Sequence, residues 1–141
     1  MSATSFIDTK VNVKLKLAAL WASFMFLYIY VDYFHLYMPG MVKDLLAGKA
    51  YIFDINQTFI VSALLLLSLP ILMIYFSVAL PARLNRIVNL IVATFYIPFT
   101  LFNLSGMVWI HMVFAAFIEV FILFVIIGCA WKWPVRESFI K

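Results

Sequence analysis

Two long stretches of the chain are almost free of charge, and they restrict the folds that the chain can adopt. No charged residue lies between Asp54 and Arg83, and Glu119 is the only one between Arg86 and Lys132. Of the 141 residues, 67% are hydrophobic and only 11% are charged, whereas about 25% of the residues in a soluble domain are charged. The chain is therefore predicted to be an integral membrane protein without room for a soluble catalytic domain.

The length of these stretches predicts the number of membrane crossings. A spanning helix needs about 20 apolar residues, so the second stretch is too long for one span. Pro39 and Gly40 end a first span, and residues 103–106 supply a turn that divides the last two. The expected fold is an all-α membrane protein, an antiparallel bundle of four transmembrane helices in a single domain of residues 1–141. The predicted spans are 17–38, 55–80, 87–102 and 107–131, with a short interfacial helix at 41–47.

The basic residues predict the orientation of this bundle. The net charge of +4 does not indicate nucleic-acid binding, because the basic residues flank the apolar segments instead of forming one exposed face. Arg83 and Arg86 are expected in a short loop on the same side as both termini, and the opposite side has only Lys43 and Lys49. The positive-inside rule then places both termini in the cytoplasm, and Trp21 is expected in the inner aromatic belt. The basic residues on the predicted inner side are Lys10, Lys14, Lys16, Arg83, Arg86, Lys132, Arg136 and Lys141.

Asp32 and Glu119 are the acidic residues inside the predicted spans. An ionisable group in hydrocarbon costs a few kcal/mol, so it usually faces the bundle interior, a water cavity or a partner. Helical spacing predicts three inward faces, one on each of three spans. They are Trp21, Phe24, Tyr28, Asp32 and His35 on the first, Asn89, Ala93, Tyr96, Thr100 and Asn103 on the third, and Met112, Ala115, Ala116, Glu119, Ile122 and Ile126 on the fourth.

These faces give a candidate ligand site or proton pathway. Glu119 is expected near the midplane, with Asp32 and the two histidines progressively closer to the outside. A structural interpretation is also open, in which Asp32 hydrogen-bonds a tyrosine or asparagine of a neighbouring helix and only fixes packing. No metal site is expected, because His111 points about 80° away from Glu119 around the fourth span. The candidate residues are Glu119, Asp32, His35, Tyr28, His111 and Asn103.

The chain resembles, over nearly its whole length, a family of small bacterial four-helix membrane proteins of unknown function. The resemblance rests on the basic entry Lys14-Leu15-Lys16-Leu17 with Leu20-Trp21, on Asp32, Pro39-Gly40, Arg86, Asn89 and Glu119, and on the exit Ala130-Trp131-Lys132-Trp133. It implies four spans and a bacterial cytoplasmic (inner) membrane, but no activity and no cofactor. It also implies an acidic residue just before the proline of the second span, where this chain has Leu69.

Three functions are consistent with these features. The first is a small transporter or channel, proton-coupled through Glu119 and Asp32, because central carboxylates and broken helices recur where solutes cross membranes. The second is a non-catalytic accessory subunit of a membrane complex, whose acids meet cationic partners. The third is an intramembrane enzyme or binding protein for a lipid or isoprenoid-like molecule. Membrane lipids and further copies of the chain are the expected partners, because four short helices enclose little interior.

Overall fold

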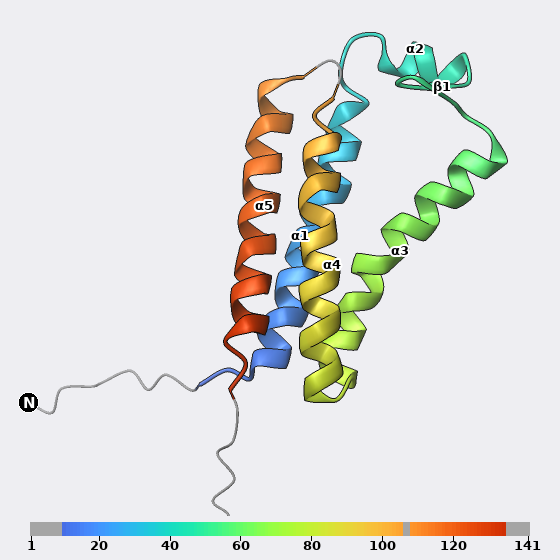
Figure 1. The fold of residues 1–141 in the computed structure, drawn as a ribbon. Coiled ribbons are helices and arrows are strands. Elements are labelled where there is room, and N and C mark those ends of the chain that lie inside the picture. Colours follow the sequence, from blue (N-terminus) through green and yellow to red (C-terminus); the bar gives the residue numbers. More distant parts are fainter. Residues whose placement is uncertain (1–9, 106–107, 135–141) are drawn as a thin grey trace, which may run out of the picture.

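The computed structural model describes residues 10–105 and 108–134. It is mostly helical, and four of its helices are long and apolar enough to cross a membrane. Figure 1 shows three of them side by side, while the fourth, α3, meets the others at its C-terminal end and leans away at its N-terminal end. The prediction of four long apolar helices is confirmed, whereas their crossing of a membrane and the single-domain assignment stay predictions. The helices are α1 (Val13–His35), α3 (Gln57–Ala79), α4 (Ala82–Phe102) and α5 (Ile110–Trp131).

Asparagine side chains fix where α1 and α3 begin. The Asn12 Oδ1 accepts a hydrogen bond of 2.9 Å from the Lys14 backbone N–H, so α1 begins at Val13, before the predicted residue 17. The Asn56 Oδ1 accepts one of 2.8 Å from the Phe59 backbone N–H at the start of α3. Each cap satisfies a backbone donor that has no partner within the helix.

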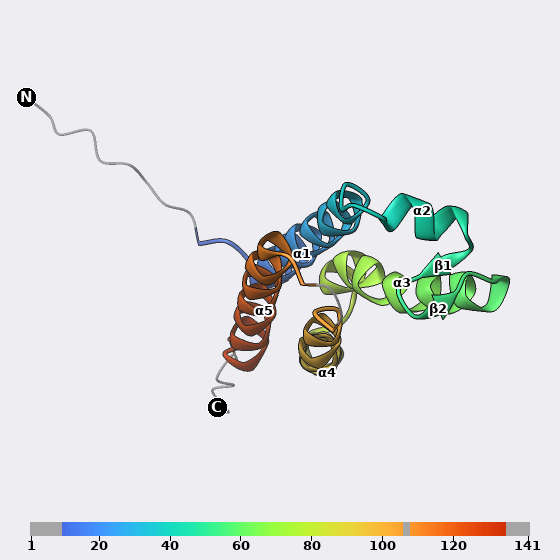
Figure 2. The ribbon, with the colours of Figure 1, turned by 90° about the horizontal axis from the view of Figure 1, so that it is seen from above.

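The segment between α1 and α3 is more structured than the all-α prediction stated. It contains α2 (Met41–Leu46), which confirms the short helix, and two strands, β1 (Lys49–Ala50) and β2 (Phe53–Asp54). The strands pair antiparallel with Lys49 opposite Asp54. Gly40 begins α2 with a φ of 92°, and Tyr51 in the hairpin turn has a φ of 54°, which is unfavourable for a residue with a Cβ. These turns lead the chain sideways from the end of α1 to the start of α3 (Figure 2).

One other predicted boundary was wrong. Arg83 and Arg86 do not form a loop, because α4 already begins at Ala82 and both arginines lie in its first turns. Long basic side chains continue a helix without difficulty, since their stems can follow the apolar surface while the charge reaches water. In the fourth span, α5 begins at Ile110, and the predicted turn and span start at residues 106 and 107 lie outside the described residues.

Most residues of the predicted inward faces are buried, although Asp32 is exposed and Asn103 and Ile122 are half-buried. On α4, the residues Asn89, Ala93, Tyr96 and Thr100 are all buried. Trp21 is completely buried, which agrees with its place on the predicted inward face, while its position in an inner aromatic belt stays a prediction. Its ring packs edge-to-face on Phe24 and Tyr96, with centroids 5.9 and 6.4 Å apart. Together, the rings of Trp21, Phe24 and Tyr96 form a buried aromatic layer that joins α1 to α4.

Pro70 in the middle of α3 is compensated by a side chain of α4. Because proline has no N–H, the carbonyl of Leu66 one turn earlier loses its helical hydrogen-bond donor. The Tyr96 hydroxyl donates a hydrogen bond to this Leu66 carbonyl. A neighbouring helix thus satisfies the backbone group that the proline frees, as the apolar interior of a membrane requires.

Candidate functional site

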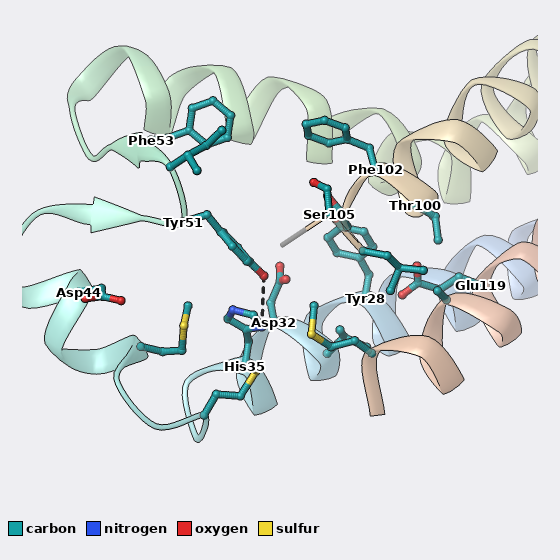
Figure 3. Close-up of a pocket in the computed structure, with 18 residues that line it drawn as sticks. Tyr28, Asp32, His35, Asp44, Tyr51, Phe53, Thr100, Phe102, Ser105 and Glu119 are labelled. Atoms are coloured by element: carbon teal, nitrogen blue, oxygen red, sulfur yellow. Dashed lines mark hydrogen bonds between the residues drawn. The ribbon is translucent and has the colours of Figure 1, made fainter. Parts of the chain in front are cut away.

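A cavity of about 560 Å³ lies at the end of the bundle where α1 leads into α2. Its walls come from α1, α2, the β1–β2 hairpin, α4 and α5, and Figure 3 shows the side chains that point into it. Of the described residues, α3 contributes none to the lining. We call this space the acidic cavity, after its three carboxyl groups, which belong to Asp32, Asp44 and Glu119.

The two carboxyl groups from the predicted spans face the same space. Glu119 is 4% exposed and lies midway along α5, whereas the Asp32 side chain projects from α1 into the open part of the cavity (Figure 3). No lysine or arginine is among the residues that line the cavity, and no ion pair forms within the described part of the chain. Two carboxyl groups therefore share an apolar cavity without a protein cation to neutralise them.

Tyr28 joins α1 to α4 beside these carboxyl groups. Its hydroxyl accepts a hydrogen bond of 2.7 Å from the Asn103 Nδ2. In Figure 3 the phenol lies between Asp32 and Glu119, close enough to interact electrostatically with both. Thr100 lies beside Glu119, and its Oγ1 is buried without a hydrogen-bond partner among the described residues. The structure thus brings together Tyr28, Asn103, Asp32 and Glu119, four of the six candidate residues.

His35 is the fifth candidate residue in the cavity. Its side chain is 8% exposed, and its Nδ1 lies 3.2 Å from the hydroxyl of Tyr51. The two rings lie with centroids 4.8 Å apart. The Nε2 of His35 is buried, and no group in the described residues hydrogen-bonds it. A buried polar atom without a partner costs free energy, so a further hydrogen-bond partner would stabilise His35.

Tyr51 extends the site beyond the bundle. Burial raises the pKa of its phenol, and the negative charge of Asp32 raises it further. Its unfavourable backbone conformation places the ring over His35, and such strained residues often cluster at ligand sites. Tyr51, Asp44 and the neighbouring Phe53 were missed as site residues, because the sequence pattern between the spans does not indicate which way the hairpin folds.

His111 does not belong to the cavity. It is near the start of α5, its ring lies 6.1 Å from the ring of Trp109, and it is not among the lining residues. The structure places it near His35, but on a different face of α5 from Glu119, as the helical spacing indicated. Within residues 10–105 and 108–134, no group of three or more His, Cys, Asp or Glu side chains is placed to hold a metal ion.

Four apolar helices and a carboxyl-lined cavity define the chain as a small helical protein of the membrane-spanning class. More particularly, it belongs to the family of unknown function DUF6326, whose model matches residues 5–138. The resemblance found in the sequence is thereby confirmed. Neither the curated proteins nor the solved structures gave a significant match.

Proposed function

We propose that the protein is a small membrane transporter that binds a lipophilic organic cation in the acidic cavity and exchanges it for protons. The observation that supports this proposal most directly is that Asp32 and Glu119 face one apolar space without a lysine or arginine among its lining residues. A carboxylate in such surroundings needs either a proton or a cation, because an unpaired charge in hydrocarbon is costly.

The remaining lining residues suit an organic cation better than a metal ion. The cavity presents the aromatic rings of Tyr28, Tyr51, Phe53 and Phe102 together with methionine side chains. Aromatic faces attract cations, and the attraction increases when the cation is shielded from water. An inorganic ion would instead need several converging oxygen or nitrogen ligands. A molecule with one positive charge on an apolar body matches both the carboxyl groups and the aromatic and apolar side chains of the lining.

Exchange follows from the same arrangement. In the empty cavity the buried carboxyl group of Glu119 holds a proton, because a neutral acid is far less costly to bury than a carboxylate. A bound cation compensates a carboxylate and so favours proton release. The two processes are thermodynamically linked, so a proton gradient drives the cation in the opposite direction.

The closed core favours a carrier over a channel. The aromatic layer of Trp21, Phe24 and Tyr96 is completely buried, and along α1 and α4 it lies between the residues that line the cavity and the Lys14 end of the bundle. A molecule in the cavity can therefore cross only if helices rearrange. Pro70 in α3 and Pro98 in α4 interrupt the helical hydrogen bonding. Helices bend at such positions, which would allow the rearrangement.

The two other functions have less support from the site. An accessory subunit is expected to turn its acids outward, whereas Glu119 is buried in the cavity and only Asp32, which also lines it, is exposed. An enzyme is expected to have a histidine hydrogen-bonded to an acid, whereas the hydrogen bond of His35 in the described structure is to Tyr51. The apolar cavity itself does favour a lipid or isoprenoid-like ligand as the second candidate, with His35 as the polar contact.

The proposal includes a setting for the transporter. Both termini lie in the cytoplasm, and the membrane is a bacterial cytoplasmic (inner) membrane. The leaning α3 exposes large apolar side chains such as Leu64 and Leu65, at 61% and 66%, to lipid or to a second copy of the chain. We include a homo-oligomer in the proposal because such a copy would enclose more interior than four helices do alone.

Titration of the purified protein with tetraphenylphosphonium, in weakly buffered detergent solution, tests the proposal. The wild type is expected to bind this lipophilic cation and to release protons, whereas Glu119→Gln binds more weakly and releases fewer. Asp54→Asn is the matched control, because Asp54 is an acid in the β1–β2 hairpin whose side chain does not line the cavity. Binding without proton release, or equal binding by Glu119→Gln and the wild type, would overturn the exchange mechanism. Displacement of a bound neutral lipid, without cation binding, would support the second candidate.

A further inference from the structure

A second cavity, of about 510 Å³, lies at the opposite end of the bundle, between the start of α1 and the end of α5. It is lined by three lysines, Lys10, Lys16 and Lys132, and otherwise by apolar or small residues. Among the described residues, no acidic side chain lines this cavity. We call this space the basic groove. From its composition we propose that it binds an anionic phospholipid, with the phosphate at the lysines and an acyl chain along the apolar wall.

The basic groove has the polarity of a lipid. Its apolar wall is formed by Val13 from α1 and by Val125, Gly128 and Cys129 from α5. Val125 precedes Lys132 by seven residues, which is about 10 Å along a helix that rises 1.5 Å per residue. The charge is therefore at the end of the span, where a headgroup lies, and the apolar wall extends toward the hydrocarbon.

The lysines at the start of α1 are divided between two tasks. The Lys14 Nζ donates hydrogen bonds to the carbonyls of Val78 and Leu80, at 3.1 and 2.6 Å, and so caps the end of α3. Lys16 lies on the side that faces the groove and is exposed, as is Lys132 across from it. The groove lysines thus hold positive charge on two different helices around one space.

A phospholipid fits this combination better than a soluble anion. Basic pockets between the ends of transmembrane helices are a recurring form of anionic-lipid recognition. Free phosphate would use only the lysines and gain nothing from the apolar wall. A zwitterionic lipid would cover the apolar wall, but its headgroup would also bring a positive charge close to the lysines. The negatively charged phospholipid satisfies both parts of the groove.

Native mass spectrometry of the delipidated full-length protein tests the inference, with phosphatidylglycerol and phosphatidylcholine of the same acyl chains as probes. Phosphatidylglycerol is expected to bind about tenfold more tightly than phosphatidylcholine. The double variant Lys16→Gln/Lys132→Gln is expected to lose that preference, since each lysine near a lipid headgroup contributes about fivefold in affinity. Lys43→Gln/Lys49→Gln is the matched control, because it removes two lysines outside the groove. Equal affinity for the two lipids, or equal loss in both double variants, would overturn the inference.

Gly128→Leu tests the apolar wall without changing charge. A Cβ at Gly128 would have no atom within 4 Å, so the variant is expected to fold while its side chain fills the groove. It should weaken phosphatidylglycerol binding severalfold. If Gly128→Leu binds this lipid as the wild type does, or if inorganic phosphate competes with the lipid at equal concentration, the site is one for a soluble anion and the inference fails. This test does not depend on the proposed transport function, because it measures neither cation binding nor proton release.

Discussion

The indole Nε1 of Trp21 donates a hydrogen bond of 2.7 Å to the Oδ1 of Asn89, and both side chains are completely buried. The bond links α1 to α4 through the Trp21 ring of the aromatic layer. The Asn89 Nδ2 in turn donates to the Oδ1 of Asn85, at 2.7 Å, and the Asn85 Nδ2 donates to the Ser77 carbonyl of α3, at 2.6 Å. This polar chain connects three helices at the end of the bundle that holds the basic groove.

Replacing Asn89 by leucine should destabilise the protein by about 2 kcal/mol, because the indole N–H of Trp21 and the Asn85 amide lose a partner in the apolar interior. The free energy of unfolding, measured by titration with a denaturing detergent, gives this value. Ser68→Ala is the control, since the Ser68 hydroxyl bonds only the Leu64 carbonyl of its own helix. A change no larger than that of the control would mean that packing alone joins these helices.

Tyr96→Phe should destabilise the protein by about 1 kcal/mol, because the Leu66 carbonyl that Pro70 leaves free then has no donor. Adding Pro70→Ala should recover part of the loss, since alanine restores the N–H that the helix needs. The same unfolding measurement on the two single variants and the double variant checks this. Additive effects would show that Tyr96 and Pro70 are not coupled. Tyr75→Phe, at an exposed tyrosine of α3, is the control.

Glu119→Gln should fold but abolish proton-driven uptake of tetraphenylphosphonium into proteoliposomes, because the amide keeps the shape of the side chain and cannot release a proton. Circular dichroism and size-exclusion chromatography verify folding, and uptake is measured after a pH gradient is imposed. Asp54→Asn should transport like the wild type. A fully active Glu119→Gln variant would reduce Glu119 to a packing residue.

Labelling of single cysteines tests the orientation. In a Cys129→Ser background, a cysteine in place of Arg83 should react only with a reagent that reaches the cytoplasmic side, and one in place of Lys49 only with a periplasmic reagent. Both native residues are exposed in the structure and lie at opposite ends of α3. The positive-inside rule predicts this pattern. The reverse pattern would require both termini to be outside.

Tyr51 provides a pH-dependent test of the acidic cavity. Its pKa is raised by burial and then by the charge of Asp32, so the folded protein holds the phenol proton more tightly than the unfolded chain. Stability contributed by Tyr51 is therefore present below the ordinary tyrosine pKa of about 10 and is lost as the pH rises through the higher folded-state pKa. Asp32→Asn should lower the Tyr51 pKa, as followed by NMR of ¹³C-labelled tyrosine. An unchanged pKa would mean that Asp32 does not face Tyr51.

Much of the candidate site could be predicted from the sequence, because it depends on local periodicity. The spacing of Asn89, Tyr96 and Thr100 predicted the buried face of α4, and that of Tyr28 and His35 predicted the inward face of α1. In a long apolar helix, a polar residue at regular intervals has few alternatives to the interior. The four long helices followed from hydrophobicity alone, because each is an apolar stretch of sufficient length.

Other features depended on how the helices are rotated and where the connecting segment lies. The spacing placed Trp21 on the inward face of α1, but only the tertiary structure showed that its indole N–H bonds Asn89 on a neighbouring helix. Tyr51 lies on His35 because the hairpin folds back over α1, and His111 is outside the cavity because of the rotation of α5. The sequence by itself determined which segments form long apolar helices and which faces turn inward, since these depend on neighbouring residues. The tertiary structure decided which of those faces share a cavity, because that depends on contacts between residues far apart in the chain.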